Sequence, residues 1–238
     1  MAQLTLSVQL PDDETFVSFQ SNSNQSVVDF LKAFIGSTDE NIVPHANEDI
    51  YGFYLFGLTG VGKSHLLHAC CAYAHENNQS SVCLSFSELQ HLSVEVLEGL
   101  EHIDLVCLDD VQLISDQQHW QQAVFDLYNR ICENNKKLII TGDKSVSELT
   151  LTLPDLRSRL SRGYVEQIKP LLDDEKLSAI QFRAHQRGLV LNDDVARFLM
   201  SRLSRDMHSL LNALDRLDSA SIREQRKITI PFIKEVLF

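Results

Sequence analysis

The chain has 238 residues, 44% of them hydrophobic, which is enough for a sizeable core in one large domain or in a domain with a smaller companion. Its net charge is −12; residues 1–169 hold 10 Lys and Arg against 23 Asp and Glu, whereas residues 170–238 hold 11 against 10. An acidic body repels a polyanionic duplex, so strong direct binding to nucleic acid is disfavoured. No apolar run reaches the roughly 18 residues of a membrane span and the N-terminus does not resemble a signal peptide, so we expect a cytoplasmic protein without membrane contact.

Residues 2–10 alternate apolar and polar side chains before a turn-like Pro-Asp-Asp. This period fits an edge strand that packs on its own domain. It fits equally well an extended peptide that offers Leu4 and Leu6 to a groove on another protein. Farther on, residues 27–35 predict an amphipathic helix. Two aromatic residues before it, Phe16 and Phe19, either flank a bound base or seal the core, and the pattern leaves both readings open.

A phosphate-binding loop of the form G-x-x-x-x-G-K-[ST] is the strongest motif in the chain. Its residues are Gly57, Leu58, Thr59, Gly60, Val61, Gly62, Lys63 and Ser64. Glycines let backbone N–H groups approach an anion, the lysine reaches the β- and γ-phosphates, and the serine hydroxyl ligates Mg²⁺. An apolar strand at residues 51–56 precedes the loop and a helix at residues 65–75 follows it, an arrangement that brings phosphates to a helix N-terminus. We therefore expect a bound nucleotide with Mg²⁺.

Strands and helices alternate along the chain up to residue 168. Further strands are expected at residues 81–86, 104–109, 137–141 and 164–168, and helices at 87–91 and 117–134. This alternation predicts a parallel sheet covered by helices on both faces. The third strand ends in Asp109 and Asp110. In a nucleotide hydrolase, the first acid of such a pair helps to hold Mg²⁺ and the second orients the attacking water.

Two further groups of polar residues are candidates for contact with a terminal phosphate. The fourth strand leads into Thr141-Gly142-Asp143, where either Thr141 or Asp143 is placed to sense that phosphate. A short helix at residues 153–162 carries three arginines, Arg157, Arg159 and Arg162. Arginine is permanently charged and its guanidinium is forked, so it is suited to stabilise negative charge on a transferring phosphoryl group. The same helix also fits a solvated basic face that pairs with the acidic body.

The sequence changes character after Lys169-Pro170. The segments that predict helices here are residues 173–187, 193–203, 207–222 and 231–237. They indicate a small all-helical second domain.

The order of these motifs resembles the AAA+ family, and within it the DnaA group of bacterial replication initiators, over nearly the whole chain. The residues that carry the resemblance are the phosphate loop, Leu108-Asp109-Asp110-Val111-Gln112, Ile140-Thr141-Gly142-Asp143 and Leu156-Arg157-Ser158-Arg159-Leu160. It implies an α/β fold in which a P-loop AAA+ core with a parallel five-stranded sheet is followed by a small all-helical lid. It also implies three parts: an extended clamp-binding segment at residues 1–12, the nucleotide-binding core at 13–169 and the lid at 170–238.

The same resemblance implies roles toward partners. Arg159 matches the arginine finger, which acts on a nucleotide held by a neighbouring subunit, while the other two arginines become flanking charges. Gln3, Leu4 and Leu6 look like a short peptide that docks on the β sliding clamp. Initiators of this group continue into a DNA-reading domain, whereas this chain ends after the lid. The resemblance therefore implies a DnaA homologue that inactivates the initiator.

Contacts with an adenine nucleotide are implied in the same way. Phe16 and Phe19 fall in the region that borders the base, and His65 directly follows the phosphate loop. Where the lid of the family has a second sensor arginine, this chain has His208. Histidine is mostly neutral near pH 7, so its hold on a terminal phosphate is weaker. ADP is therefore favoured over ATP as the bound nucleotide, and the chain's own hydrolysis of ATP is in doubt.

The function expected from these observations is negative regulation of replication initiation. The nucleotide-bound chain docks on the DNA-loaded clamp and promotes hydrolysis of ATP on a DnaA-type initiator. One alternative is a self-sufficient AAA+ ATPase such as a helicase loader, in which Asp110 and Asp143 serve its own hydrolysis. Another is a DNA-binding initiator fragment. Whether the chain forms a homo-oligomer stays open.

Overall fold

The computed structural model describes residues 14–36, 51–203 and 206–238, which form two compact units. The first unit contains the described residues up to Phe16 and those of Asn24–Lys169. The second contains Val17–Ser23 and the described residues of Pro170–Phe238. Within the described residues, no helix has both the length and the apolar character needed to cross a membrane.

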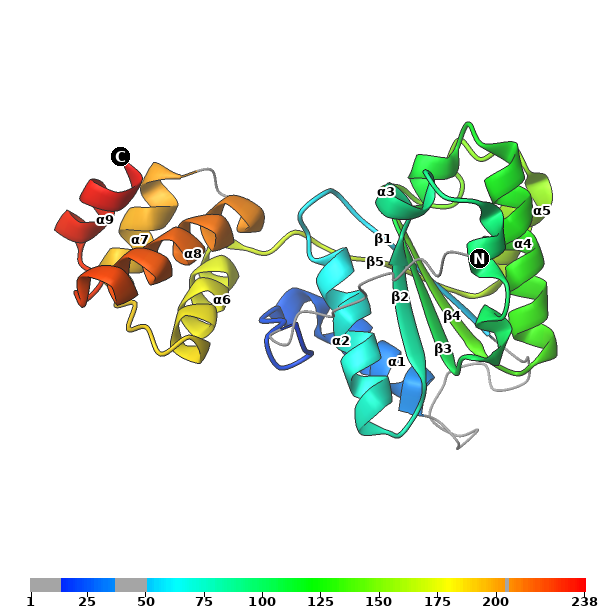
Figure 1. The fold of residues 1–238 in the computed structure, drawn as a ribbon, viewed down its shortest axis with the longest axis horizontal. Coiled ribbons are helices and arrows are strands. Elements are labelled where there is room, and N and C mark those ends of the chain that lie inside the picture. Colours follow the sequence, from blue (N-terminus) through cyan, green and yellow to red (C-terminus); the bar gives the residue numbers. More distant parts are fainter. Residues whose placement is uncertain (1–13, 37–50, 204–205) are drawn as a thin grey trace. The chain divides into compact units, whose positions relative to one another are not determined.

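A parallel five-stranded sheet forms the centre of the first unit, with the strand order β2-β3-β4-β1-β5 (Figure 1). The strands are β1 (Gly52–Phe56), β2 (Ser81–Ser85), β3 (Leu105–Asp109), β4 (Lys137–Gly142) and β5 (Tyr164–Gln167). Each neighbouring pair is parallel. The predicted five-stranded parallel sheet is thus confirmed. Strand β2 ends one residue earlier than expected, because Ser85 caps the next helix by accepting a hydrogen bond from the Ser87 backbone N–H.

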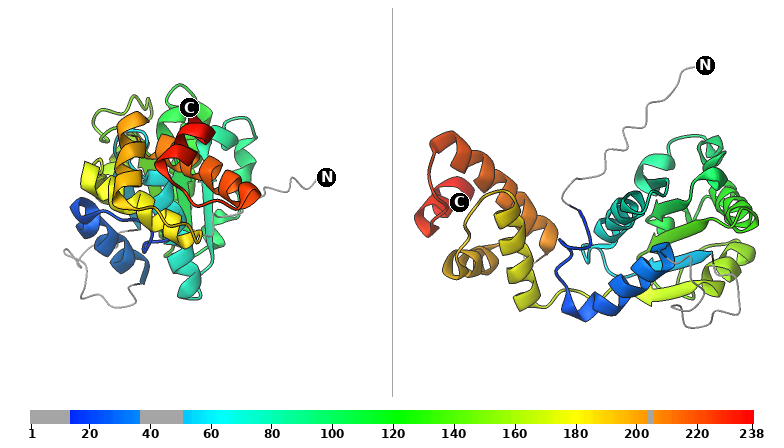
Figure 2. Two further views of the ribbon diagram at one scale, coloured as in Figure 1. Left: turned by 90° about the vertical axis from the view of Figure 1, so that its left-hand side faces the viewer. Right: turned by 90° about the horizontal axis from the view of Figure 1, so that it is seen from below.

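Helices cover both faces of this sheet (Figure 1 and Figure 2). One face is covered by α1 (Gln25–Gly36) and α2 (Lys63–Glu76), and the other by α4 (Gln118–Glu133) and α5 (Pro154–Arg162). Successive side chains of a strand point to opposite faces. Accordingly, Phe53 packs its ring 5.6 Å from that of Phe34 on α1, whereas Tyr54 belongs to the core cluster that contains Trp120 of α4.

Short helical turns that the sequence did not predict complete the first unit. They are η2 (Val94–Leu97), η3 (Leu100–His102) and η4 (Val111–Ile114), beside the expected α3 (Phe86–Leu89), while a further turn, η1 (Asn22–Asn24), spans the boundary between the two units. Leu97, Leu100 and Ile114 from these turns enter the core on the α4 face. A single turn is too short to show a helical period, which explains why the pattern missed them.

The second unit consists mainly of helices, as the sequence predicted. They are α6 (Asp173–Gln186), α7 (Asp193–Arg202), α8 (Met207–Glu224) and α9 (Ile230–Leu237). Their apolar sides form one core. Members that are fully buried include Ile180, Leu199, Leu210, Leu214 and Phe232.

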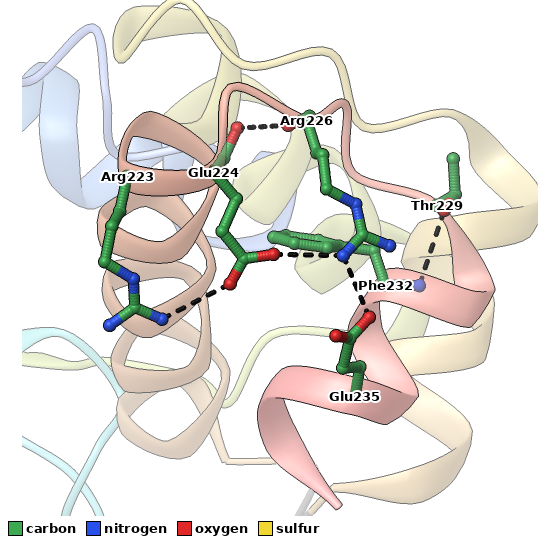
Figure 3. A network of polar contacts seen from close by, with 7 residues as sticks. Arg223, Glu224, Arg226, Thr229, Phe232 and Glu235 are labelled. Atoms are coloured by element: carbon green, nitrogen blue, oxygen red, sulfur yellow. Dashed lines mark hydrogen bonds and ion pairs between the residues drawn. The ribbon is translucent and has the colours of Figure 1, made fainter.

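Polar contacts hold the corner between α8 and α9 (Figure 3). The Arg226 guanidinium lies 4.8 Å from the centre of the Phe232 ring and donates to both Glu224 and Glu235. Thr229 caps α9 by accepting a hydrogen bond from the Phe232 backbone N–H. Because the guanidinium is bonded to carboxylates on both sides of the corner, it fixes the direction in which the chain enters α9.

The segment Val17–Ser23 joins the helical unit although it precedes the sheet in the sequence. Ser23 donates its backbone N–H to the Glu175 carboxylate at 2.9 Å, at the first turn of α6. The next residue, Asn24, belongs to the first unit, where its side chain bonds both the N–H and the carbonyl of Lys169 at 2.8 and 2.9 Å. The boundary between the two units therefore falls between Ser23 and Asn24.

Candidate nucleotide-binding site

The phosphate loop connects the carboxyl end of β1 to the first residue of α2. Two of its glycines have left-handed backbone conformations, Gly60 with φ of 80° and Gly62 with φ of 97°. Residues with a Cβ rarely adopt these angles, so both positions favour glycine. Gly62 is also the N-cap of α2 and makes no side-chain cap, which leaves the first N–H groups of the helix for another acceptor.

Lys63 is buried inside this loop. Its ammonium donates to the carbonyl oxygens of Gly57 at 2.9 Å and Leu58 at 3.3 Å. Among the described residues, no carboxylate forms an ion pair with it. A buried ammonium held only by neutral carbonyls is short of negative charge. The residues of the loop therefore fit a phosphate group, which would bring that charge.

Three elements converge on Asp109 at the carboxyl edge of the sheet. The Ser64 hydroxyl on α2 donates to its Oδ2 at 2.5 Å, and the Thr141 hydroxyl at the end of β4 donates to its Oδ1. The Asp110 backbone N–H in turn donates to the Thr141 oxygen at 2.9 Å. A hydroxyl and one carboxylate, completed by phosphate oxygens and waters, are the ligands that Mg²⁺ prefers beside a nucleotide. Ser64 and Asp109 therefore fit such an ion, and within the described residues there is no larger metal-binding cluster.

The second acid, Asp110, has an uncommon backbone for a residue with a side chain, with φ of 62°. Its Oδ1 accepts a hydrogen bond of 2.9 Å from the Gln112 amide. Asp143 is half-buried beyond the end of β4, and its Oδ1 has no hydrogen-bond partner among the described residues. Burial raises the pKa of the Tyr54 hydroxyl well above its usual value, and the nearby negative charge of Asp143 raises it further. Thr141 is thus bonded to Asp109.

The remaining residues predicted to contact the nucleotide lie in different places. Phe16 is buried, with its ring edge-on to that of Tyr73 at 5.7 Å, so it contributes to the core of the first unit. His65 bonds the Thr15 carbonyl through Nε2 at 3.0 Å. Phe19 belongs to the second unit, as does His208, which is exposed near the start of α8. The predicted clamp-binding residues Gln3, Leu4 and Leu6 lie outside the described residues.

Arg159 lies on the opposite face of the sheet from α2, in the last turn of α5. Its guanidinium lies over the rings of Phe125 and Tyr128 from α4, 6.0 and 5.9 Å from their centres. Burial is the largest cause that raises the Tyr128 pKa to about 12, while the charge of Arg159 opposes the rise. Within the described residues, none of the three arginines of α5 pairs with a carboxylate. Among the described residues, the three arginines of α5 therefore do not form an acid-paired basic face.

Comparison with known proteins identifies the family. The model of the bacterial DnaA ATPase domain matches residues 12–167, and the model of the Hda lid domain matches residues 173–237. The chain belongs to the bacterial DnaA ATPase family. With the match of its lid, it is an Hda-like AAA+ protein, as the motifs predicted.

Solved structures share this fold. Domain III of the Thermotoga maritima replication initiation protein DnaA is similar with a TM-score of 0.80 and 19% identity, over 96% of this chain and 97% of that chain. AMPPCP-bound DnaA from Aquifex aeolicus is similar with a TM-score of 0.70 and 18% identity, over 91% and 71%. The RuvB Holliday junction branch migration motor of Thermotoga maritima follows with a TM-score of 0.67 and 13% identity, over 96% and 72%. The predicted AAA+ architecture is confirmed.

Two buried or partly buried polar interactions of the first unit were not foreseen from the sequence. The Glu14 carboxylate bonds Nδ1 of His68 on α2, and Gln121 is completely buried in α4. The second had a visible signal, because Gln121 falls three and seven residues before Val124 and Tyr128 on the apolar stripe of α4. A polar residue at such a position predicts a buried and fully bonded side chain. For Glu14, no local pattern pointed to His68.

Proposed function

We propose that this Hda-like protein negatively regulates replication initiation by promoting hydrolysis of ATP bound to a DnaA-type initiator. It acts in the cytoplasm, with adenine nucleotide and Mg²⁺ in its own phosphate loop. The peptide Gln3, Leu4 and Leu6 docks it on the DNA-loaded β sliding clamp, and Arg159 acts on the initiator's nucleotide. Family membership and the lid match support the link to replication initiation.

The position of Arg159 is the observation that carries this proposal. Arg159 lines a small cavity with Gly52, Tyr54, Leu138 and Ile140, which belong to the first three residues of β1 and the first four of β4. The phosphate loop begins at Gly57, beyond the carboxyl end of the five-residue strand β1. A strand of that length spans about 17 Å, and the loop leads into a helix on the other face of the sheet. Because Arg159 and the helix that follows the phosphate loop lie on opposite faces of the sheet, we propose that the nucleotide served by Arg159 belongs to another molecule.

The chemistry follows from a fixed positive charge. Arg159 carries no carboxylate partner among the described residues, so a partner's phosphate does not compete with an internal ion pair. During phosphoryl transfer, negative charge spreads over the oxygens of the γ-phosphate and the leaving group. An arginine supplied from a neighbouring molecule stabilises that charge and accelerates hydrolysis by about 10³–10⁵-fold in characterised cases.

The chain's own nucleotide has a structural role in this proposal. Lys63 holds the phosphates, and Ser64 and Asp109 hold Mg²⁺. The lid carries His208 where the family has an arginine, and this difference supports ADP as the favoured nucleotide. The AMPPCP bound by the Aquifex aeolicus relative supports adenine as the base. A homo-oligomer is one arrangement in which this nucleotide shapes an interface.

The decisive experiment measures ATP hydrolysis by purified DnaA in the presence of clamp-loaded DNA and this protein. Arg159→Ala is expected to reduce the stimulated rate by at least about 10²-fold while nucleotide and clamp binding persist. Arg157→Ala, an exposed arginine of the same helix, is the matched control and keeps stimulation. Deletion of residues 1–10 is expected to remove only the clamp-dependent part. Unchanged stimulation with Arg159→Ala would overturn the proposal.

A self-sufficient ATPase is the second candidate, and one observation favours it. Asp143 keeps a buried carboxylate oxygen without a hydrogen-bond partner among the described residues, beyond the end of the same strand that holds Thr141. Such an oxygen is suited to orient a water near the chain's own phosphates. Robust steady-state hydrolysis by the isolated protein, abolished by Asp110→Asn or Asp143→Asn, would establish this function instead.

A further inference from the structure

Gln121 connects two segments of the first unit through a fully bonded, completely buried amide. Its Nε2 donates to the carbonyls of Ile114 at 3.0 Å and Ser115 at 2.6 Å. Its Oε1 accepts from the backbone N–H groups of Thr152 and Leu153, both at 2.9 Å. Only one orientation of the amide satisfies carbonyls on one side and N–H groups on the other. The side chain therefore fixes both segments in one geometry.

The first of these segments begins at the acidic end of β3. Turn η4 directly follows Asp110, and the Leu113 N–H donates to the Asp110 carbonyl at 3.0 Å. Gln112 from the same turn bonds the Asp110 side chain. The carbonyls that Gln121 binds belong to the last residue of this turn and the residue after it. The Nε2 end of the Gln121 amide is thus connected through turn η4 to Asp110.

The second segment starts the helix that carries Arg159. Leu153 is the N-cap of α5, and its carbonyl accepts from the Arg157 N–H at 3.3 Å. Pro154 at the first helical position has no N–H to contribute, so the Thr152 and Leu153 N–H groups are the donors that attach this end of the helix to α4. α5 is nine residues long, so a shift at its start is transmitted to Arg159 in its last turn.

We infer that Gln121 is a positioning residue for Arg159, which fixes the start of α5 relative to the acidic end of β3. The inference rests on the proposed finger role of Arg159. A catalytic charge displaced by about 1 Å loses on the order of 10²-fold in rate. An apolar side chain at position 121 leaves the Ser115 carbonyl and two N–H groups without their partner, while the Ile114 carbonyl keeps the Gln117 N–H. The segment before α5 then relaxes. The effect falls on the rate of the bound complex rather than on its formation.

The test compares Gln121→Met and Gln121→Glu with the wild-type chain in the DnaA hydrolysis assay. Gln121→Met is expected to lower the maximal stimulated rate by about tenfold or more, while the concentration for half-maximal stimulation and ADP binding stay within about twofold. Gln121→Glu keeps the acceptor for Thr152 and Leu153 and loses both donors, so its maximal stimulated rate falls between those of the wild-type chain and Gln121→Met. Gln181→Met, which also removes an amide bonded to a backbone carbonyl but in the helical unit, keeps the wild-type rate.

Hydrogen exchange provides a second readout on the same folded proteins. The amides of Thr152 and Leu153 are expected to exchange about tenfold faster in Gln121→Met than in wild type, while those of β4 stay protected. A full maximal rate for Gln121→Met, or a loss that matches a loss of folded protein, overturns the inference. Arg159→Ala in the same assay separates the two claims. If it keeps stimulation, the proposed function fails; if it abolishes stimulation and Gln121→Met does not, only the role of Gln121 fails.

Discussion

The hydroxyl of Ser64 donates a 2.5 Å hydrogen bond to the carboxylate of Asp109, across 45 positions of the sequence. The contact joins the first turn of α2 to the end of β3. These are the two side chains that we propose as ligands of Mg²⁺, and the fold brings them together. They would hold the ion beside the phosphates of a bound nucleotide, where it would offset their negative charge.

Removing the charge of Asp109 tests this assignment. Asp109→Asn keeps the size of the side chain but takes away the negative charge that attracts Mg²⁺. We expect the Mg²⁺-dependent gain in ADP affinity to fall by about tenfold or more, measured by nucleotide titration with Mg²⁺ and with a chelator. The matched control is Asp104→Asn, because Asp104 lies just before the start of β3 and pairs with Lys136. Equal losses with and without Mg²⁺ would contradict a metal role.

Thr141→Val tests the polar connection behind the acid pair. The substitution keeps the shape of a completely buried residue but leaves the Asp109 Oδ1 without its donor and the Asp110 N–H without its acceptor. Unsatisfied buried groups cost about 1–3 kcal/mol, so the free energy of unfolding should fall by that amount in denaturant titrations. Thr150→Val, at an exposed threonine, should change it by less than about 0.5 kcal/mol. Equal stability of the two variants would show that the hydroxyl is dispensable.

The contact between Glu14 and His68 predicts a pH-dependent contribution to stability. Their atoms lie 2.5 Å apart, and the hydrogen bond to Glu14 is the largest cause that raises the His68 pKa, against burial. A histidine with a raised pKa in the folded state stabilises fully below its unfolded value of about 6.5, and this stabilisation is lost as the pH rises through the folded pKa. Glu14→Gln should therefore lower the melting temperature by about 2 °C at pH 6 and by almost nothing at pH 9.

Differential scanning fluorimetry across this pH range is sufficient for the measurement. Glu76→Gln, an exposed glutamate at the end of the same helix α2, should show no pH-dependent difference from wild type. If the melting temperature of Glu14→Gln differs from that of wild type by the same amount at pH 6 and pH 9, protonated His68 is not the source of the difference.

The close approach of Tyr54 to Gly142 predicts strong coupling between the two positions. A Cβ at Gly142 would overlap the Tyr54 hydroxyl oxygen, which donates to the Lys144 carbonyl at 2.7 Å. Tyr54 is buried and has little room to move, so Gly142→Ala should cost about 1–3 kcal/mol of unfolding free energy. In a Tyr54→Phe background the alanine should cost about 1 kcal/mol less, because the nearest atom is gone. Additive effects in denaturant titrations would contradict this packing.

The central sheet could be predicted because its strands are unambiguous in the sequence. The run Leu105 to Leu108 is apolar without interruption, as expected for a strand covered on both faces. The phosphate loop was equally clear, because its glycines and its lysine match the pattern of a phosphate-binding loop. Membership of Val17–Ser23 in the helical unit could not be predicted, because its contact between Ser23 and Glu175 joins positions 152 residues apart.

The surroundings of Arg159 also lay beyond the sequence. The pattern of α5 allowed either a finger or an acid-paired basic face, and it did not indicate what lies beside Arg159. In the structure, the guanidinium lies over the rings of Phe125 and Tyr128 from α4. Periodicity assigns side chains to a face of their own helix but does not say which residues of another helix they meet.

The aromatic support beneath Arg159 has a consequence for the entropy of complex formation. A free arginine loses about 2 kcal/mol of rotamer entropy when a partner immobilises it. Here the guanidinium already lies over two rings of α4. In the proposed complex, part of that loss therefore accompanies folding of the chain instead of association with the partner, and the side chain would meet the partner's phosphate in a conformation that is already restricted.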